Sequence, residues 1–325
     1  MGAERFTSAE SARAYAESVF RGRLGEPVDT SVIPNSRNYL FRMEAGDGHE
    51  YVVKVYASTS ELIGGCEAVA YERLKGNSFI RKCFGINHGS AGAPAWAIFE
   101  YVRGETLLDS IDHLQADPQA QRRVMHEIAR FVRDCTAIGM QGYGDIDAQF
   151  RGARPSWPDF IEHYLEHLGR SVCNVQDVAA REQMERGMRC LQRFVVHASD
   201  FLRTRPSTFV PVDLNMANFL IGRDGRLVAL DLENFLAADP LLALGEWAGH
   251  TFGTSRYDVF MAEWGDLADL ERASVRFYAL LCNVDVLMYI VNNGIAAAGE
   301  AHPWGNPNRF VDLVGGHIAW LDANA

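Results

Sequence analysis

The chain has 325 residues, which is enough for two lobes that each bury a substantial apolar interior. Its composition, 48% hydrophobic and 22% charged, is that of an ordinary globular protein and excludes a disordered chain. The formal net charge of -11, without any run of Lys and Arg, argues against a nucleic-acid partner and suits a cationic ligand, although many proteins carry such a charge for solubility.

The six cysteines are dispersed and form no CxxC pair, which predicts reduced, mostly buried thiols. The first twenty residues lack the basic and apolar segments of a secretory signal. The most apolar late stretch, residues 277–298, contains Asn and Asp side chains that would be costly in a bilayer. We therefore expect a buried helix there, a cytoplasmic protein and no membrane partner.

The first hundred residues predict a mixed sheet with one principal helix. A short helix over residues 8–20 comes first, because its small and apolar residues follow a helical spacing. Residues 31–44 and 49–58 are rich in β-branched and aromatic residues and predict two strands joined by a Gly-Asp-Gly turn. A helix over 61–75 and two further strands, over 80–86 and 94–102, complete this region.

From Gly104 onward the apolar spacing is mainly helical. The helices are predicted over residues 118–138, 157–168, 178–202 and 267–291. Residues 209–234 form one β-rich island within them, with an Arg-Asp-Gly hairpin turn. The fold class is therefore α+β. We expect a sheet-based N-lobe over 1–103 and a mostly helical C-lobe over 104–325.

The β-rich island carries a set of oxygen-bearing side chains. Asp213 precedes Asn218 by five residues in PVDLNMANFL, and Asp231 ends the strand LVALDLE. Hard oxygen ligands of this kind suit Mg²⁺, and phosphoryl transfer requires an oriented hydroxyl beside a metal held between phosphates. By itself the Asp-to-Asn spacing is weak, because Asp213 could cap a turn and Asn218 could stabilise a loop.

The two segments VDLNMANFLI and ALDLENFLAADP together resemble the paired motifs of the aminoglycoside phosphotransferase and choline kinase family, which is related to the protein kinases. The resemblance implies a bilobal protein-kinase-like fold, with ATP or GTP as phosphate donor and Mg²⁺ as cofactor. It implies that the N-lobe over 1–103 binds nucleotide phosphates and that the C-lobe over 104–325 carries the catalytic loop, the metal site and the acceptor pocket. It implies that Asp213 is the catalytic base and that Asn218 and Asp231 are metal ligands. Asp239 would close the second motif. Glu233, two residues beyond Asp231, could assist a second Mg²⁺.

The first region matches the same family. Lys54, in the strand YVVKVY, resembles the family's phosphate-binding lysine, and the chain has only two other lysines. Glu67 stands where the family's helix carries the glutamate that pairs with this lysine, with Glu72 as the alternative. The segment IFEYVRGETL resembles the hinge between lobes, where backbone groups near Glu100 and Val102 would bind adenine.

Two segments depart from the family pattern. The loop PNSRNY lacks the glycines that let backbone amides approach phosphates, so we expect Ser36, Arg37 and Asn38 to contact phosphates through their side chains. Pro211 and Val212 stand where the family has His and Gly before the catalytic Asp. The missing His would normally help to hold the catalytic loop.

The predicted function is transfer of the γ-phosphate of ATP or GTP to a hydroxyl of a small molecule. The negative charge, the acidic segment 258–271 and the family-like stretch GYGDID favour a cationic antibiotic, an aminoglycoside or a basic peptide, with resistance as the outcome. For the acidic segment itself, a solvent-facing helix start is the favoured interpretation over a surface that receives cationic amines. Two alternatives remain: a metabolic kinase of the choline, homoserine or sugar type, and a nucleotide-binding pseudoenzyme.

Overall fold

The computed structural model describes residues 6, 8–34, 38–57, 61–87, 89, 94–147, 149–294 and 307–324. The chain forms two compact units. Unit 1 comprises Met1–Glu105 and Phe219–Asn234, and unit 2 comprises Thr106–Asn218 and Phe235–Ala325. The segment Phe219–Asn234 thus belongs to unit 1 by its contacts, although it lies far along the sequence. The assignment of separate functions to residues 1–103 and 104–325 stays a prediction.

Unit 1 contains a five-stranded antiparallel sheet in the order β1-β2-β3-β5-β4. Its strands are β1 (Pro27–Ile33), β2 (Tyr39–Ala45), β3 (Glu50–Val55), β4 (Cys83–Asn87) and β5 (Trp96–Glu100). The single strand predicted over 31–44 is wrong, because the structure has β1 and β2 there. β1 ends at Ile33, directly before Pro34, and proline has no N–H with which to continue a strand ladder.

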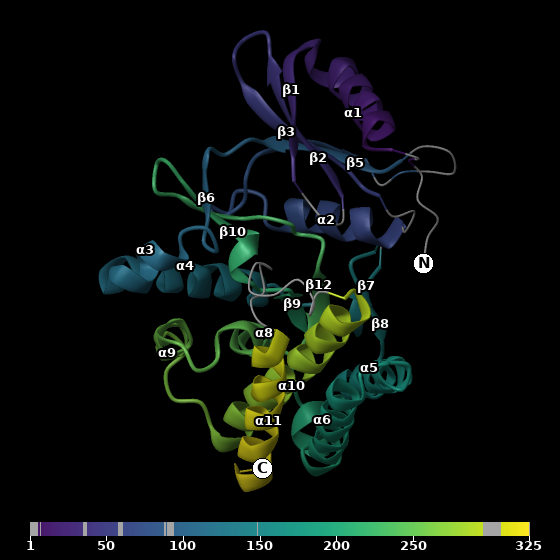
Figure 1. Ribbon diagram of the computed structural model, residues 1–325, viewed down its shortest axis with the longest axis vertical. Helices are drawn as coiled ribbons and strands as arrows, with labels where there is room; N and C mark the ends of the chain where they lie inside the picture. The colour runs from purple at the N-terminus through teal and green to yellow at the C-terminus, as the bar shows by residue number, and fades with distance from the viewer. Residues whose placement is uncertain are drawn as a thin grey trace. The chain divides into compact units, whose positions relative to one another are not determined.

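Two helices accompany this sheet, α1 (Ala9–Leu24) and α2 (Glu61–Arg73), as Figure 1 shows. Phe20 of α1 is fully buried in one core cluster with Val53 and Val55 of β3. Successive side chains of a strand point to opposite faces, so Lys54 points away from this cluster and reaches α2. The alternation of β3 therefore places a cationic side chain on the α2 side of the sheet.

A smaller sheet in the order β11-β10-β6 holds the late hairpin to unit 1. It consists of β6 (Gly104–Thr106), β10 (Phe219–Gly222) and β11 (Leu227–Ala229). A Cβ atom at Gly104 would lie 2.1 Å from the carbonyl oxygen of Ile221, so this approach requires glycine. The backbone N–H of Ala229 donates to the carbonyl of Phe79 at 2.9 Å. Asp231, two residues further on, is thereby held within unit 1.

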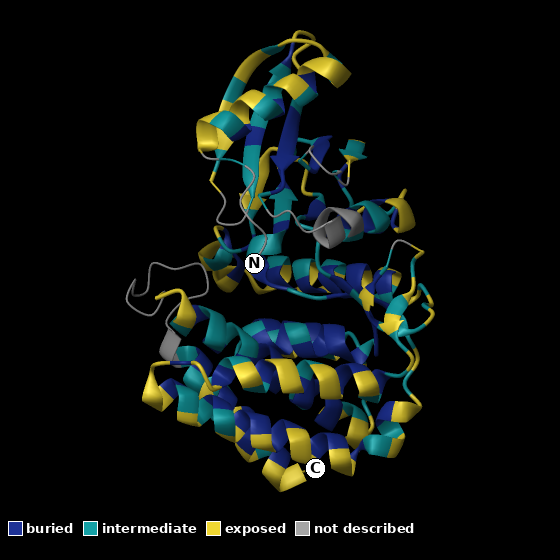
Figure 2. Cartoon of the chain, turned by 90° about the vertical axis from the view of Figure 1, so that its right-hand side faces the viewer, coloured by how far each residue is buried: buried dark blue, intermediate teal, exposed yellow. Residues whose placement is uncertain are grey.

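Unit 2 is mostly helical and has a four-stranded sheet in the order β8-β7-β12-β9. The strands are β7 (Tyr143–Ile146), β8 (Gly152–Arg154), β9 (Thr208–Pro211) and β12 (Phe235–Ala238). The helices are α3 (Ile111–Ala116), α4 (Pro118–Thr136), α5 (Trp157–Val172), α6 (Val178–His197), α7 (Ser199–Arg203), α8 (Leu241–Thr251), α9 (Ser255–Ala262), α10 (Asp269–Asn292) and α11 (Pro307–Asn324). In Figure 2 the helices carry buried and exposed residues on opposite faces, as amphipathic packing requires.

Helix α10 is the central helix of unit 2. By length and composition it is apolar enough to cross a membrane, but most of its apolar stretch is buried inside the protein. It packs against α8, α11 and α6. A helix in the core of a globular protein can be long and apolar enough to resemble a membrane-spanning helix. The helix predicted over 267–291 is therefore present and buried.

Candidate active site

Four charged side chains meet in unit 1. The ammonium Nζ of Lys54 lies 2.9 Å from a carboxylate oxygen of Glu67 on α2 and 2.6 Å from one of Asp231, and it also contacts Glu233. The side chain of Lys54 is 3% exposed and that of Glu67 is fully buried, whereas that of Asp231 keeps 30% of its surface. The pairing of Lys54 with Glu67 that the resemblance implies is present in the structure, and Asp231 joins it. Glu72, the alternative, is exposed.

Two neutral side chains complete this cluster. The hydroxyl of Tyr56 donates to the same oxygen of Glu67 that accepts from Lys54. The side-chain amide of Asn38 donates to Glu233 at 2.6 Å, and its carbonyl accepts from the backbone N–H of Ala57 at 3.3 Å. Asn38 was predicted to contact phosphates, and in this structure it contacts a carboxylate of the cluster. Ser36 and Arg37, predicted for the same role, lie outside the described residues.

Burial and the mutual interaction of these groups shift their pKa values in different directions. Burial works against the charged form of Lys54, but the surrounding carboxylates hold its pKa above the ordinary value. Burial favours the neutral form of Asp231, but the Lys54 ammonium, a hydrogen bond with Glu233 and the charge of Arg81 together lower its pKa below the usual range. Glu233 is different: burial, with Asp231 and Glu67 adding to it, raises its pKa to about 8 despite Lys54.

The donor set of this cluster fits a magnesium ion. One oxygen each from Glu67, Asp231 and Glu233 lies within 4.8 Å of the others, and Mg²⁺ takes hard oxygen ligands. Repulsion from Asp231 and Glu67 contributes to the raised pKa of Glu233, and a divalent cation would offset it. One carboxylate oxygen of Glu67 is buried without a hydrogen-bond partner among the described residues. The chemistry and the charge of these residues therefore suit Mg²⁺.

The predicted catalytic loop lies in unit 2, between β9 and a 3₁₀ turn over Met216–Asn218. The side-chain amide of Asn215 donates to the carboxylate of Asp213 at 2.7 Å, and that of Asn218 donates to the Asp213 carbonyl at 2.9 Å. The backbone N–H of Asp213 donates to the carboxyl group of Glu246 at 3.1 Å. Asp213 and Asn218, predicted as base and metal ligand, are thus directly hydrogen-bonded within one loop.

Backbone strain marks two of the predicted residues. Among the non-glycine residues that the structure describes, positive φ angles occur at Phe150, Asp213 and Asp231, with 61° at Asp213 and 53° at Asp231. Left-handed backbone is unfavourable for a residue with a Cβ atom, and such strain gathers at functional sites. Here it coincides with the two carboxylates that the sequence motifs single out.

The structure shows what holds the loop in the absence of the family's His. Pro211, at that position, is buried at the end of β9 and pairs with Phe235 of β12. The loop is instead fastened by Glu246 from α8 and by Asn215, which also caps the turn by accepting from the backbone N–H of Ala217 at 2.9 Å. Loss of the His therefore leaves an ordered loop around Asp213.

Glu246 is a site residue that sequence reasoning missed. It stands in LLALGEWAGH, where an acidic residue interrupts an otherwise apolar helix, and such a residue is seldom inside a protein without a partner. Burial is the main cause that raises its pKa to about 8, and the nearby Asp213 and Asp285 carboxylates add to it. At neutral pH Glu246 is therefore largely protonated, and its oxygen still accepts the Asp213 N–H.

Asp239 is a structural residue of unit 2. Its carboxylate is fully buried, pairs with Arg205 Nε at 3.0 Å and accepts from the Tyr278 hydroxyl at 2.8 Å. A third hydrogen bond comes from the backbone N–H of Leu241 at 3.1 Å, at the start of α8. A buried carboxylate with these partners fixes the helix that carries Glu246.

The predicted hinge residues lie at the end of β5 in unit 1. The carboxylate of Glu100 accepts from Arg226 at 3.1 Å and from the backbone N–H of Lys82 at 3.1 Å. Val102 lies in the irregular segment that follows, beside Gly222 of β10. Adenine binding by their backbone groups stays a prediction.

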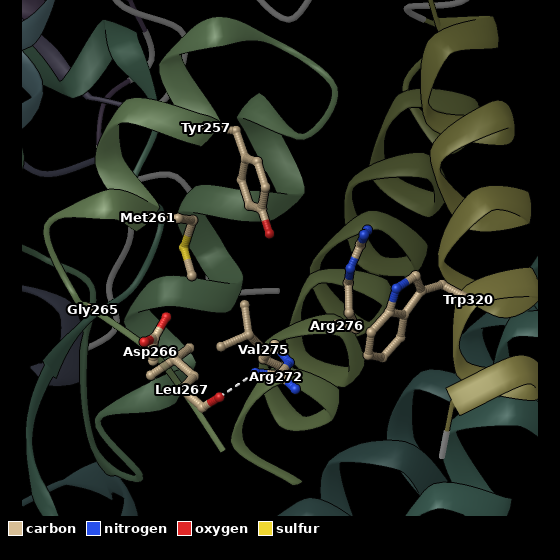
Figure 3. A pocket seen from close by; sticks show the side chains of 9 residues that line it. All are labelled: Tyr257, Met261, Gly265, Asp266, Leu267, Arg272, Val275, Arg276 and Trp320. Atoms are coloured by element: carbon tan, nitrogen blue, oxygen red, sulfur yellow. Dashed lines mark hydrogen bonds between the residues drawn. The ribbon is translucent and has the colours of Figure 1, made fainter. Parts of the chain in front are cut away.

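A pocket of about 280 Å³ lies in unit 2 near the acidic segment 258–271 (Figure 3). Asp266 lines it, but so do Arg272 and Arg276, so the lining is not acidic overall. The carboxylate of Glu271 accepts from the backbone N–H of Ala268 at the start of α10, and Asp269 pairs with Arg272. These contacts favour the alternative of a charged helix start over a surface that receives cationic amines.

A scan against protein-family models and a search of the curated proteins found no match for this sequence. Solved structures do match its fold. A thermostable variant of the aminoglycoside phosphotransferase APH(4)-Ia, in complex with AMP-PNP and hygromycin B, has a TM-score of 0.70 at 16% identity and covers 93% of this chain and 97% of its own.

Two other solved structures are similar over nearly the whole chain. The GDP and kanamycin complex of an APH(2") enzyme has a TM-score of 0.60 at 16% identity and covers 94% of this chain and 97% of its own. A provisionally named fructosamine-3-kinase from Thermobifida fusca has a TM-score of 0.59 at 18% identity, with 93% and 98% covered. The chain therefore has the bilobal, kinase-like α+β fold of the aminoglycoside phosphotransferases, and the predicted fold class is confirmed.

Proposed function

We propose that the protein is a small-molecule O-phosphotransferase that moves the γ-phosphate of ATP or GTP to a hydroxyl group. One observation carries this proposal: Asp213 and Asp231, the carboxylates of the two sequence motifs, both have left-handed backbone. The buried pairing of Lys54 with Glu67 supports it. The fold shared with structures that hold AMP-PNP or GDP supports a nucleotide donor.

In the proposed reaction Asp213 orients the acceptor hydroxyl and takes its proton while the hydroxyl oxygen bonds to the γ-phosphorus. The bond from that phosphorus to the β-phosphate oxygen breaks, and ADP or GDP leaves. Asn215 keeps the accepting oxygen of Asp213 in place through its 2.7 Å hydrogen bond. General-base catalysis of this kind contributes about 10²- to 10⁴-fold.

The other predicted site residues would bind the phosphate groups of the donor nucleotide. Lys54 would neutralise phosphate charge with its ammonium, which Glu67 holds in place at 2.9 Å. Asn218 and Asp231 would hold Mg²⁺, with Glu233 as a further oxygen ligand. The ion, when bound, stabilises the charge on the phosphate oxygens. Backbone groups near Glu100 and Val102 would bind the adenine or guanine base.

The proposed acceptor is a cationic antibiotic, an aminoglycoside or a basic peptide, and the outcome is resistance in the cytoplasm. The net charge of -11 supports a cationic acceptor, and the fold is shared with complexes of hygromycin B and kanamycin. A metabolic kinase is the second candidate, because the fructosamine-3-kinase from Thermobifida fusca has the same fold. The replacement of His by Pro211 motivates the third, a nucleotide-binding pseudoenzyme.

The test is nucleotide turnover with Mg²⁺ and either ATP or GTP across a panel of acceptors. The panel contains aminoglycosides, basic peptide antibiotics, choline, homoserine, sugars and glycated amines. Acceptor-dependent release of ADP or GDP that is lost in Asp213→Ala supports the proposal and identifies the acceptor class. Nucleotide binding without turnover for any acceptor, and without a difference between wild type and Asp213→Ala, would favour the pseudoenzyme.

A further inference from the structure

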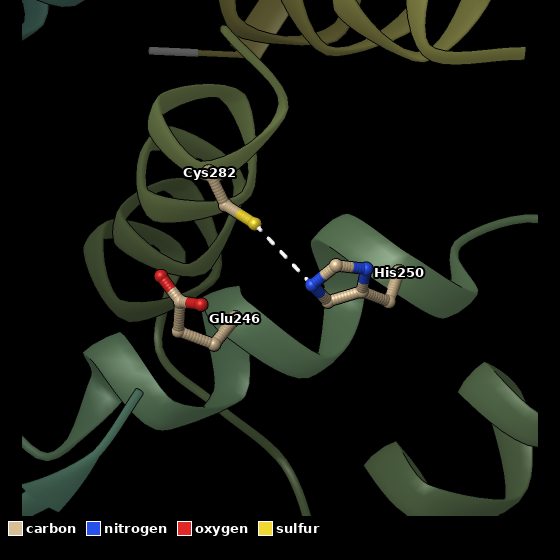
Figure 4. A group of neighbouring side chains, drawn as sticks. All are labelled: Glu246, His250 and Cys282. Atoms are coloured by element: carbon tan, nitrogen blue, oxygen red, sulfur yellow. Dashed lines mark hydrogen bonds between the residues drawn. The ribbon is translucent and has the colours of Figure 1, made fainter. Parts of the chain in front are cut away.

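Three side chains of different chemistry meet between two helices of unit 2. Glu246 and His250 are one turn apart on α8, and Cys282 faces them from α10 (Figure 4). One ligand atom of each lies within 4.8 Å of the other two, and His250 Nε2 is 3.8 Å from Cys282 Sγ. Residues four apart on a helix lie on one face, so the sequence of α8 fixes this spacing.

The helix packing is shaped around the thiol. A Cβ atom at Gly249 would lie 2.8 Å from Cys282 Sγ, so a larger residue there would displace the sulfur. Asn283, the next residue of α10, donates to the Gly249 carbonyl at 2.7 Å and fixes the register of the two helices. The absence of a side chain at Gly249 and the hydrogen bond of Asn283 therefore keep the thiol close to α8, and sites on packed helices hold their ligands precisely.

The donor set is that of a zinc site. A thiolate, an imidazole and a carboxylate are the three ligand types that Zn²⁺ takes, and three protein ligands leave a fourth position open. Tetrahedral zinc at about 2.3 Å from sulfur and about 2.0 Å from nitrogen holds these two atoms about 3.5 Å apart. The observed 3.8 Å needs only a small adjustment.

Burial and the neighbouring acidic groups raise the pKa of the Cys282 thiol well above its ordinary value, so zinc would have to displace its proton. Burial, with Arg309 adding to it, lowers the pKa of His250 to about 4, so its ring is neutral and can donate a lone pair at pH 7. The carboxyl groups of Asp213 and Asp285 lie close enough to Glu246 to raise its pKa. A cation here would offset that excess of acidic groups.

We propose that Glu246, His250 and Cys282 form a binding site for a zinc ion, separate from the proposed magnesium site. Binding forms bonds from zinc to sulfur, nitrogen and oxygen, and the protons of the thiol and the carboxyl group pass to solvent. Glu246 is shared with the catalytic loop, because it also accepts the backbone N–H of Asp213 at 3.1 Å. Zinc binding would draw on that carboxyl group and weaken its hold on the loop.

The direct test uses Co²⁺ as a spectroscopic substitute for zinc, with the full chain and millimolar Mg²⁺ present to occupy the carboxylates of unit 1. The measurements are the thiolate-to-cobalt charge-transfer absorption and its displacement by Zn²⁺. We expect the absorption in wild type and its loss in Cys282→Ser, and we expect His250→Ala to weaken binding by more than about tenfold. Cys173→Ser removes an exposed thiol and serves as the matched control.

Two results of the cobalt measurement would contradict the zinc site. Retained charge-transfer absorption in Cys282→Ser, or no absorption in a wild type whose far-ultraviolet circular dichroism shows it folded, would overturn it. Circular dichroism and urea unfolding without metal establish that the variants fold. Zinc should also lower acceptor-dependent turnover in wild type and in Cys173→Ser but not in Cys282→Ser. Equal inhibition of all three would contradict the coupling to Asp213.

Discussion

In unit 1 the contacts join charged groups. The ammonium of Lys54 contacts three carboxyl groups, and its position depends on their ionisation. In unit 2 Asp213 is held by the side-chain amide of Asn215 and by Glu246, whose carboxyl group is largely neutral at pH 7. The contrast suits the proposed tasks, because a phosphate and metal site needs charge, whereas a base needs one carboxylate in a fixed direction. It also means that the two sites should respond differently to pH and to substitution.

The largest expected effect is on unit 1, where Lys54→Met leaves three carboxylates without their ammonium partner. Removing one partner of a buried ion pair costs about 3–5 kcal/mol in the free energy of unfolding. Without Lys54 the folded carboxylates bind protons more tightly than in the unfolded chain, so the loss grows as the pH rises from 5 to 8. Urea unfolding at both pH values measures this.

The matched control for that substitution is Lys82→Met, because Lys82 is exposed. Its free energy of unfolding should stay within about 0.5 kcal/mol of wild type. A loss in Lys54→Met that is the same at pH 5 and pH 8 would contradict the electrostatic account of unit 1.

The second prediction concerns Glu246, whose pKa of about 8 is above the ordinary carboxyl value. Its proton stabilises the folded chain fully below the unfolded pKa of about 4.3, and this contribution is lost as the pH rises through 8. The free energy of unfolding therefore falls over this window, by at most about 1.4 kcal/mol per pH unit. Glu246→Gln keeps an acceptor for the Asp213 N–H but cannot titrate, so its curve should be flatter.

This comparison is made in metal-free buffer, so that zinc does not compete for the carboxyl group. Glu162→Gln, on the exposed face of α5, should retain the slope of wild type. Parallel curves for wild type and Glu246→Gln would show that Glu246 is ionised across the whole pH window. That result would contradict the account in which a neutral carboxyl group of Glu246 holds the loop.

The third prediction separates positioning from binding in unit 2. Asn215→Ala removes the amide that donates to the Asp213 carboxylate and the oxygen that caps the turn. We expect a loss of about 1–2 kcal/mol in unfolding free energy and about tenfold in kcat, without a change in nucleotide Kd. Asn324→Ala, at an exposed helix end, is the control. An increase in nucleotide Kd with unchanged kcat would exclude the positioning role.

The smallest expected effect concerns the left-handed backbone of Asp231 in unit 1 and of Asp213 in unit 2. Asparagine tolerates left-handed backbone better than alanine, by about 1 kcal/mol. Asp231→Ala should therefore be less stable than Asp231→Asn by about this amount, and Asp213→Ala less stable than Asp213→Asn likewise. Thermal unfolding of the four variants measures the two differences. Equal stability within either pair would mean that the left-handed conformation at that position costs no free energy.

Sequence patterns predicted those parts of the site that depend on local spacing. The alternation of YVVKVY places Lys54 on one face of β3, and the five-residue separation of Asp213 and Asn218 closes one loop. The separate strands β1 and β2 were missed because both are rich in β-branched and aromatic residues, and the composition alone did not mark Pro34 as the end of a strand.

The contacts that come from distant elements could not be predicted. Glu246 follows Asp213 by more than thirty residues, and its role depends on how α8 packs, which Asp239 and Arg205 determine. The zinc ligands illustrate the same limit: His250 and Cys282 are far apart in sequence and meet only through the packing of α8 on α10. Their spacing along the chain follows no metal-binding pattern.

The most direct test of the central claim is transfer of label from γ-labelled ATP or GTP to an acceptor in the presence of Mg²⁺. Wild type is compared with Asp213→Asn and with Asp200→Asn, whose side chain is 96% exposed. We predict labelled acceptor with wild type and Asp200→Asn, and a rate lower by about 10³-fold in Asp213→Asn with unchanged nucleotide affinity. Equal transfer by Asp213→Asn, or no transfer by wild type to any acceptor of the panel, would contradict the claim.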